Sequence, residues 1–199
     1  MINKVIKLCD EQLISKLVVL NLGDLVAGRI HLPIRLNSRI DVITQIMSVS
    51  EMLAQALFTL SKHVSIEYFS VIDNHSRLDP NKKDAIQLES LARITDWYLE
   101  ERFKNCSDVI IHPNKDGKDI LTFKVFNYNF AGVHGDLDSP SKIVENVSLM
   151  TKQHYDVIFS SHMHHWSLNE ETQTVVISNP SLMGTDELAV KLRKNSKPA

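Results

Sequence analysis

Four short apolar runs in this chain each end at residues whose side chains carry an oxygen or nitrogen donor. The runs KLVVLNLGD, VSIEYFSVIDNH, YNFAGVH and DVIFSSHMH have the length and apolar content of buried strands. Open α/β sheets place their ligand sites outside the carboxyl ends of the strands. We therefore expect the donors at these four ends to form a site: Asp24, Asn74 with His75, His134, and His162 with His164.

The last of these runs ends in a His-x-His pair. If extended geometry continues beyond Ser161, residues two apart point to the same side, so His162 and His164 can meet one ion. Neutral imidazole suits first-row transition metals. Because paired histidines are more often surface or core residues, the prediction of a metal site depends on the other three strand ends.

The order of these motifs resembles the signature of the calcineurin-like metallophosphoesterase family. That signature runs Asp-x-His, Gly-Asp, Gly-Asn-His-Asp/Glu, a lone His and Gly-His-x-His. The chain matches its last four parts, between Leu17 and Gly184, with Gly23-Asp24, Asn74-His75, His134 and His162-Met163-His164. The resemblance implies an α/β fold in which a β-sandwich is flanked by helices, in four layers (α/β/β/α).

The resemblance also implies roles for these residues. Asp24 would bridge two metal ions; Asn74, His134 and His162 would complete one metal site, and His164 would belong to the other. His75 would stabilise or protonate the leaving oxygen. The implied cofactors are divalent ions, and the mixed oxygen and nitrogen donors suit manganese, zinc or iron alike.

Two further residues near these motifs are candidates for substrate contact. Arg77 could grip phosphate oxygens in a bidentate manner, or it could form a surface salt bridge. His31 could face the substrate or lie outside the site. The sequence leaves both questions open, and Arg77 is taken with His75 as a predicted catalytic residue.

Three positions depart from the family pattern. Asp73 stands in place of Gly, Ser76 in place of an acid, and Ser161 in place of the Gly before the histidine pair. Aspartate tolerates left-handed backbone better than most residues, so Asp73 is expected to fit a tight turn. The change at Ser76 removes one partner that could orient His75.

No Asp-x-His motif precedes Asp24. By the resemblance, a strand and two ligands would be missing, which leaves Asp24 as the one clear anionic ligand. We therefore expect the second ion to bind weakly or not at all, with impaired activity in this form. The expectation is a single domain, residues 1–199, truncated at its N-terminus, and an uncovered sheet edge that could favour a homo-oligomer.

The composition is consistent with a compact domain. The chain has 199 residues, of which 43% are hydrophobic and 23% charged, enough to bury one substantial core. Its net charge of -2 gives no overall attraction for nucleic acid or a membrane surface. No apolar run is expected to approach the roughly 20 residues of a membrane span, and the expected location is the cytoplasm. Helices are expected over residues 2–15, 36–62, 80–103 and 140–153, with strands between them and a turn at Asn169-Glu170. Met47 and Met52, on the second of these helices, are expected to fill the core.

The function implied by the resemblance is metal-dependent hydrolysis of a phosphoester, with a phosphodiester favoured and nucleic acid as one candidate substrate. Two alternatives belong to other classes. One is a non-catalytic relative that keeps the scaffold in order to bind a partner. The other is a structural metal site that has no open position for a substrate.

Overall fold

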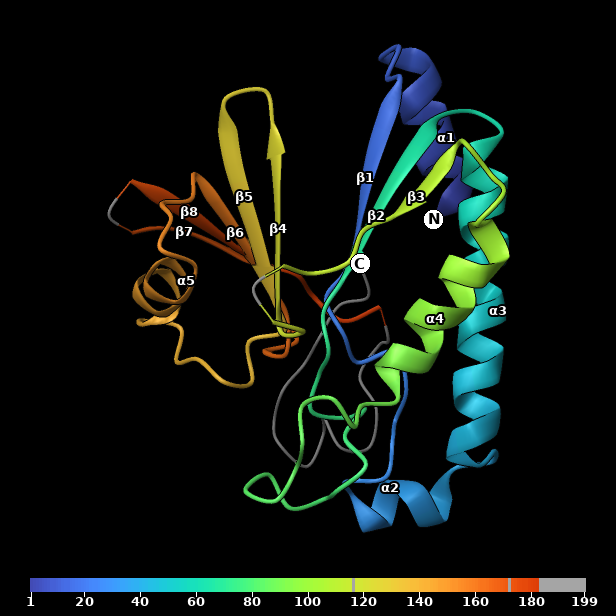
Figure 1. The fold of residues 1–199 in the computed structure, drawn as a ribbon, viewed down its shortest axis with the longest axis vertical. Helices are drawn as coiled ribbons and strands as arrows, with labels where there is room; N and C mark the ends of the chain where they lie inside the picture. Colours follow the sequence, from blue (N-terminus) through green and yellow to red (C-terminus); the bar gives the residue numbers. More distant parts are fainter. Residues whose placement is uncertain (116, 172, 183–199) are drawn as a thin grey trace. The chain divides into compact units, whose positions relative to one another are not determined.

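Helices and strands alternate along the chain and build two compact units. The computed structural model describes residues 1–115, 117–171 and 173–182. The chain divides into residues 1–114 and 115–199, and each unit has its own sheet with helices beside it (Figure 1). The predicted class is confirmed, because the fold is mixed α/β with two sheets flanked by helices. The four-layer arrangement and the single domain stay predictions.

The first unit is built on a parallel three-stranded sheet of order β1-β2-β3. Helices α3 and α4 pack together, and both contact this sheet (Figure 1). The core between them includes the buried residues Leu57, Tyr68 and Leu99. The elements are α1 (Ile2–Glu11), β1 (Lys16–Asn21), α2 (Leu32–Asn37), α3 (Val42–Ser61), β2 (Ser65–Ser70), α4 (Ala92–Phe103) and β3 (Val109–Ile111).

Helix α3 has the length and apolar composition of a membrane span, with a mean hydropathy of 1.2. The expectation that no apolar run reaches this length is therefore wrong for α3. The physical reason lies in its packing: Ala54, Leu57 and Leu60 form a buried stripe that contributes to the core of the first unit. A helix that contributes this much to a core needs a high apolar content.

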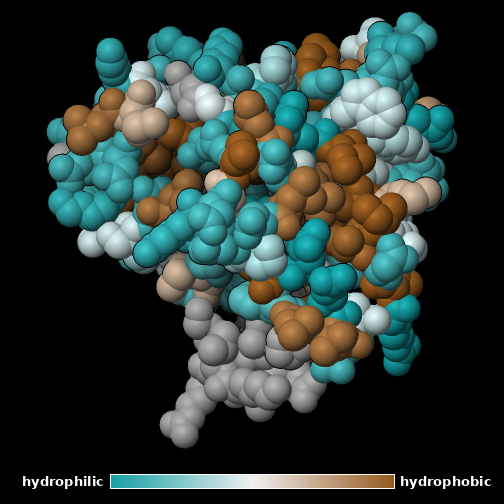
Figure 2. Space-filling model, turned by 60° about the horizontal axis from the view of Figure 1, so that its bottom comes forward, coloured by the Kyte–Doolittle hydropathy of each residue, from teal (hydrophilic) through white to brown (hydrophobic). Residues whose placement is uncertain are grey.

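Two methionines on α3 lie on its outer face instead of in the core. Met47 is 67% exposed and Met52 is 62% exposed, so a prediction that they fill the core is wrong. Other large apolar side chains are also exposed in this unit, among them Leu36 of α2. Figure 2 shows hydrophobic side chains gathered in patches on the face that it displays.

The second unit has a five-stranded mixed sheet of order β4-β5-β6-β8-β7. Strands β5, β6 and β8 run parallel, and the outer strands β4 and β7 pair antiparallel to their neighbours. Its core includes Val147 of α5, Ile158 of β6 and the fully buried Tyr155. The elements are β4 (Ile120–Val125), β5 (Tyr128–Val133), α5 (Ile143–Thr151), β6 (Val157–Ser160), β7 (Ser167–Glu171) and β8 (Thr174–Ser178).

The strands agree with the sequence patterns better than the helices do. The long helix expected over residues 36–62 begins only at Val42, because the Asp41 carboxylate accepts hydrogen bonds from the backbone N–H groups of Ile43 and Thr44 and caps it there. The helix expected from residue 80 begins only at Ala92. Before it, the Asp79 side chain bonds the Asn81 backbone N–H, which favours a turn over a helix.

A turn expected at Asn169-Glu170 is also wrong. Both residues belong to β7, where Asn169 pairs with Val176 and Glu170 pairs with Val175 of β8. Four of the five residues of this edge strand are polar, and its three central residues are exposed, so a search for apolar runs does not find it. The strand therefore extends to Glu171.

We expect Ile158→Ala to lower the free energy of unfolding of the second unit by about 2–4 kcal/mol, because Ile158 is fully buried in its core. Leu168→Ala is the control, since this side chain on β7 is exposed and its loss should change stability by less than about 0.5 kcal/mol. Urea unfolding followed by Trp166 fluorescence, with Trp97 replaced by Phe, measures both. Equal losses in the two variants would contradict the assigned core.

Candidate metal centre

The carboxyl ends of β1 and β2 bring two predicted ligands to the same edge of the first sheet. These strands are parallel neighbours, with Asn21 beside Ser70 and a hydrogen bond of 3.0 Å from the Val71 N–H to the Asn21 carbonyl. Asp24 follows β1 by three residues, and Asn74 follows β2 by four. The first unit therefore presents a carboxylate and an amide at one edge, as the motifs predicted.

The backbone at Asp24 lies in the left-handed region, with φ of 55°. A non-glycine residue rarely adopts this conformation, and its cost is on the order of 1 kcal/mol or more. The conformation turns the chain sharply as it leaves the sheet. The side chain of Asp24 is half-buried there.

His75 is oriented by a backbone carbonyl. Its Nδ1 lies 2.9 Å from the Ala27 carbonyl oxygen, which can only accept a hydrogen bond. We assign the Nδ1 proton to this bond, which leaves Nε2 for chemistry. The close approach depends on Gly28, because a Cβ there would overlap the carbonyl oxygen of His75 and its φ of +67° disfavours other residues.

Two of the departures from the family pattern compensate each other. The Asp73 carboxylate accepts hydrogen bonds from the Ser76 N–H at 2.8 Å and from the Ser76 hydroxyl at 2.7 Å, and both residues are buried. The turn is therefore held by a side chain. The prediction that Asp73 uses left-handed backbone is wrong, since Asp73 is not among the residues with positive φ.

Two nitrogen-bearing side chains, those of His31 and Arg77, lie near His75 in the first unit. The His31 ring meets the His75 ring edge-on, with centroids 5.4 Å apart, and Arg77 Nε donates to the Asn74 carbonyl at 3.1 Å. Partial burial lowers the pKa of His31, and the nearby His75 and Arg77 lower it further. The Arg77 guanidinium is the permanent cation of this group, and a guanidinium can bind a phosphate oxygen.

The second unit brings two predicted imidazoles together through neighbouring parallel strands. Gly132 of β5 pairs with Phe159 of β6, so the residues two beyond them, His134 and Ser161, lie side by side. The Ser161 N–H bonds the His134 carbonyl at 3.0 Å. The rings of His134 and His162 then meet edge-on, with centroids 5.0 Å apart.

Ser161 determines which nitrogen of His134 can bind a metal. Its hydroxyl donates to the His134 carbonyl at 3.1 Å and lies 3.0 Å from His134 Nδ1. Because the hydroxyl proton is directed to the carbonyl, the hydroxyl oxygen accepts the Nδ1–H, and the Nε2 lone pair is left as the ligand. A metal-binding histidine generally needs this kind of contact on its other nitrogen. His134 itself is only 2% exposed.

The histidine pair after β6 is not extended. His162 has φ of 60° and His164 has φ of 58°, so both lie in the left-handed region. The expectation that strand geometry continues past Ser161 is therefore wrong, because the chain turns as soon as β6 ends at Ser160. His162 is half-buried beside His134, whereas His164 is exposed.

The predicted donors are thus distributed over both units. The first unit holds Asp24, Asn74, His75 and Arg77, and the second holds His134, His162 and His164. Sequence reasoning missed the Ala27 carbonyl, the tight packing at Gly28 and the contact from Ser161. The glycine itself, four residues after Asp24, was a signal for the tight packing at Gly28. A hydrogen bond to a backbone carbonyl cannot be predicted from residue types. The sharing of an ion between donors of the two units stays a prediction.

No family model matches the sequence. Among curated proteins, the chain is 27% identical over 206 residues to the SPbeta prophage-derived uncharacterised protein YonJ of Bacillus subtilis, a match that covers 98% of the chain and 50% of YonJ. The chain therefore spans half the length of this relative.

Several solved structures are similar to this fold. One is an archaeal phosphodiesterase, with 14% identity, a TM-score of 0.47, and 90% of the chain and 74% of that protein covered. Another is a predicted phosphoesterase of Streptococcus pneumoniae, with 10% identity, a TM-score of 0.40, and 85% and 74% covered. Vps29 of Entamoeba histolytica in complex with zinc has 12% identity, a TM-score of 0.42, and 91% and 81% covered. A phosphodiesterase and a predicted phosphoesterase are thus among the solved structures to which this chain is similar.

We expect the pKa of His31 to lie below its ordinary value of 6.5. Folding then disfavours the protonated ring, so the stability that His31 contributes is present above pH 6.5 and is lost as the pH falls below it. Replacing His75 by Ala should raise the pKa of His31, while the effect of burial remains. An NMR titration of the ring protons measures the pKa, with the exposed His154→Ala as the control. An unchanged His31 pKa in His75→Ala would contradict the close approach of these rings.

Proposed function

We propose that this chain is a metal-dependent phosphoesterase that hydrolyses phosphodiesters. Its metal ligands would be Asp24, Asn74, His134, His162 and His164. The observation that carries the proposal is the backbone at three of these residues. Seven described non-glycine residues have positive φ, and Asp24, His162 and His164 are among them. Such strain tends to gather at functional sites, where the surrounding structure maintains it for a purpose other than stability.

The chemistry of the donors supports a divalent transition metal. Carboxylate, amide and imidazole donors together suit manganese, zinc or iron. The contact between the Ser161 hydroxyl and His134 Nδ1 leaves the lone pair on His134 Nε2 for a metal ion. Asp24 is the one anion in the proposed set. Two divalent ions would leave a strongly cationic centre, so we propose that the first ion binds much more tightly than the second.

The protein's own groups would act on the substrate from the first unit. A bound divalent ion would supply Lewis acidity towards the phosphoryl oxygens. The Arg77 guanidinium would hold a phosphate oxygen, since its fixed fork of donors matches that geometry. His75, with Nδ1–H held by the Ala27 carbonyl, would deliver the proton on Nε2 to the leaving oxygen.

The wider assignments are part of this proposal. Nucleic acid is one candidate phosphodiester substrate, and the cytoplasm is the proposed location. Self-association is supported by the exposed apolar side chains of α2 and α3, including Leu36 and Met47, and by the hydrophobic patches visible in Figure 2. Since the chain spans half of YonJ, the activity of a longer protein belongs to the proposal as well.

The central test measures metal uptake and hydrolysis of bis(p-nitrophenyl) phosphate with Mn²⁺. Asp24→Ala and His134→Ala should each abolish tight metal binding and turnover. His75→Ala should keep the metal but lose about 10²–10⁴-fold in kcat, because general acid catalysis typically contributes that much. His154→Ala, an exposed histidine of the second unit, is the control and should behave as the parent does.

The outcomes separate the alternatives. Tight metal binding without hydrolysis, in this chain and in a longer form that contains it, would contradict the enzyme and favour a scaffold or a structural metal site. Failure to bind Mn²⁺, Zn²⁺ or Fe²⁺ in either form would reject the metal ligands themselves. Loss of binding in His154→Ala would mean that the variants act by unfolding the protein.

A second prediction isolates the orienting hydrogen bond. Ser161→Ala should weaken metal affinity by about 10–100-fold, the usual effect of removing a group that orients a metal-binding histidine. Ser141→Ala is the matched control, because Ser141 is exposed in the same unit. Competition with a chromogenic chelator measures the affinity. If Ser161→Ala binds as tightly as the parent, the assignment of Nε2 of His134 as the ligand is wrong.

A further inference from the structure

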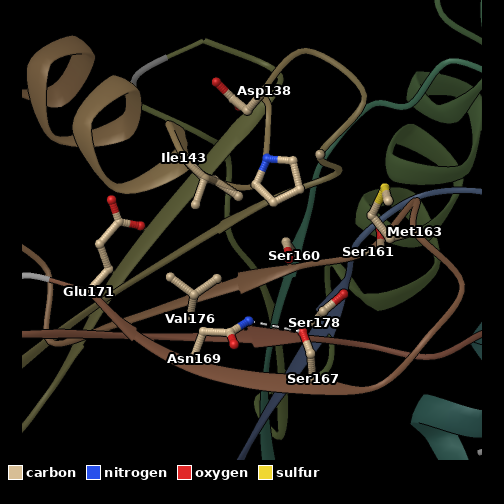
Figure 3. Close-up of a pocket in the computed structure, with 12 residues that line it drawn as sticks. Asp138, Ile143, Ser160, Ser161, Met163, Ser167, Asn169, Glu171, Val176 and Ser178 are labelled. Carbon is tan, nitrogen blue, oxygen red and sulfur yellow. Dashed lines mark hydrogen bonds between the residues drawn. The ribbon is translucent and has the colours of Figure 1, made fainter.

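A pocket in the second unit lies beside the loop that carries the histidines. Its cavity volume is about 70 Å³, which is small beside the roughly 300–1,000 Å³ of sites that enclose a whole drug-sized ligand, so we consider it for one part of a ligand only. The walls come from β6, β7 and β8, from the loop after β5 and from Ile143 at the start of α5 (Figure 3). Gly135 and Ser161, which flank the His134 backbone contact, also line it.

The uncharged polar side chains of the pocket are serine hydroxyls and one amide. Ser160, Ser167 and Ser178 project from three strands, and Asn169 donates to the Ser167 hydroxyl at 3.3 Å (Figure 3). Ser178 is 5% exposed, and its Oγ is buried without a hydrogen-bond partner among the residues that the structure describes. A buried hydroxyl without a partner costs free energy, and a ligand that bonds it would recover that cost.

The charges of the pocket exclude one class of ligand. Asp138 and Glu171 contribute carboxylates, and none of the described residues that line the pocket is Lys or Arg. A cation that acts on Glu171 from outside the lining is Lys142, whose pKa Glu171 helps to raise. Within the lining, the two carboxylates disfavour a phosphate group. Carboxylates instead accept hydrogen bonds from hydroxyl donors, as acidic residues do when they hold the hydroxyls of a ribose.

Apolar groups complete the lining. Ile143, Met163 and Val176 lie among the polar residues (Figure 3). A sugar ring offers C–H groups to such surfaces and hydroxyls to the carboxylates and serines, so its two kinds of surface match both kinds of lining. A free amine or a metal ion would use the carboxylates alone and leave the apolar groups without a contact.

We propose that this pocket binds the ribose of a ribonucleotide substrate through Glu171, Asp138 and the Ser178 hydroxyl. The inference rests on the proposed phosphoesterase function, because it assigns the part of the substrate beside the phosphodiester. The substrate class is then a phosphodiester with a 2′-hydroxyl, such as RNA or a short oligoribonucleotide. Ser161 lines this pocket and also orients His134, so one residue belongs both to the proposed sugar site and to the surroundings of the His134 and His162 rings.

The test uses uncharged nucleosides, because their binding can be measured without a metal ion and without hydrolysis. Adenosine and uridine should bind the protein, and their 2′-deoxy counterparts should bind about tenfold more weakly, since one hydrogen bond to a charged group is lost. Glu171→Gln and Ser178→Ala should each weaken binding of the ribonucleosides by a similar factor. Glu170→Gln is the matched control, because Glu170 is exposed on β7 and is not among the residues that line the pocket. NMR chemical-shift titration up to 10 mM nucleoside measures the affinities.

The results distinguish this inference from the proposed function. Absence of ribonucleoside binding at 10 mM, or equal affinity for the deoxy forms, would overturn the ribose site while hydrolysis of bis(p-nitrophenyl) phosphate could still stand. Selective ribonucleoside binding that Glu171→Gln leaves unchanged would place the sugar elsewhere and would also overturn it. Selective binding without any hydrolysis would support the ribose site and reject the enzyme.

Discussion

Parallel pairing between neighbouring strands is the constraint on which every donor position depends. Asn21 lies beside Ser70 in the first sheet, and Gly132 lies beside Phe159 in the second. These registers carry two loops to one edge in each unit. A slip of one residue would turn the side chains of a strand to the opposite face, and the bond between the Ser161 N–H and the His134 carbonyl would be lost with it.

Hydrogen bonds from outside the family pattern maintain the groups that the pattern predicts. The Ala27 carbonyl orients His75, and the hydroxyl of Ser161 orients His134. The Asp73 carboxylate and Ser76 hold the turn before His75 with a buried pair of bonds. A residue that departs from a family motif is therefore best judged together with its neighbours. Here the Asp73 carboxylate, which replaces a glycine, bonds to Ser76, which replaces an acid.

The sequence patterns predicted the strand ends well because two independent signals coincide there. Short apolar runs mark the strands, and polar donor residues end them, so Tyr128 to Val133 was anticipated residue by residue. The helices were predicted less well. Their starts depend on side-chain contacts such as the Asp41 cap, which compete with hydrophobic periodicity. The left-handed backbone at His162 was not predicted, because histidine tolerates this conformation better than most residues but adopts it only where the surrounding loop requires it.

The two units differ in the charges that they would offer a substrate. In the first, the Arg77 guanidinium is close enough to the His31 ring to lower its pKa, and that ring lies edge-on to the ring of His75. In the second, Asp138 and Glu171 line a pocket with hydroxyls and no described cation. A phosphodiester of a ribonucleotide is itself divided in this way, into an anionic phosphate and a neutral sugar rich in hydroxyl groups. The groups that could hold a phosphate oxygen thus belong to the first unit, and the groups that could hold sugar hydroxyls belong to the second.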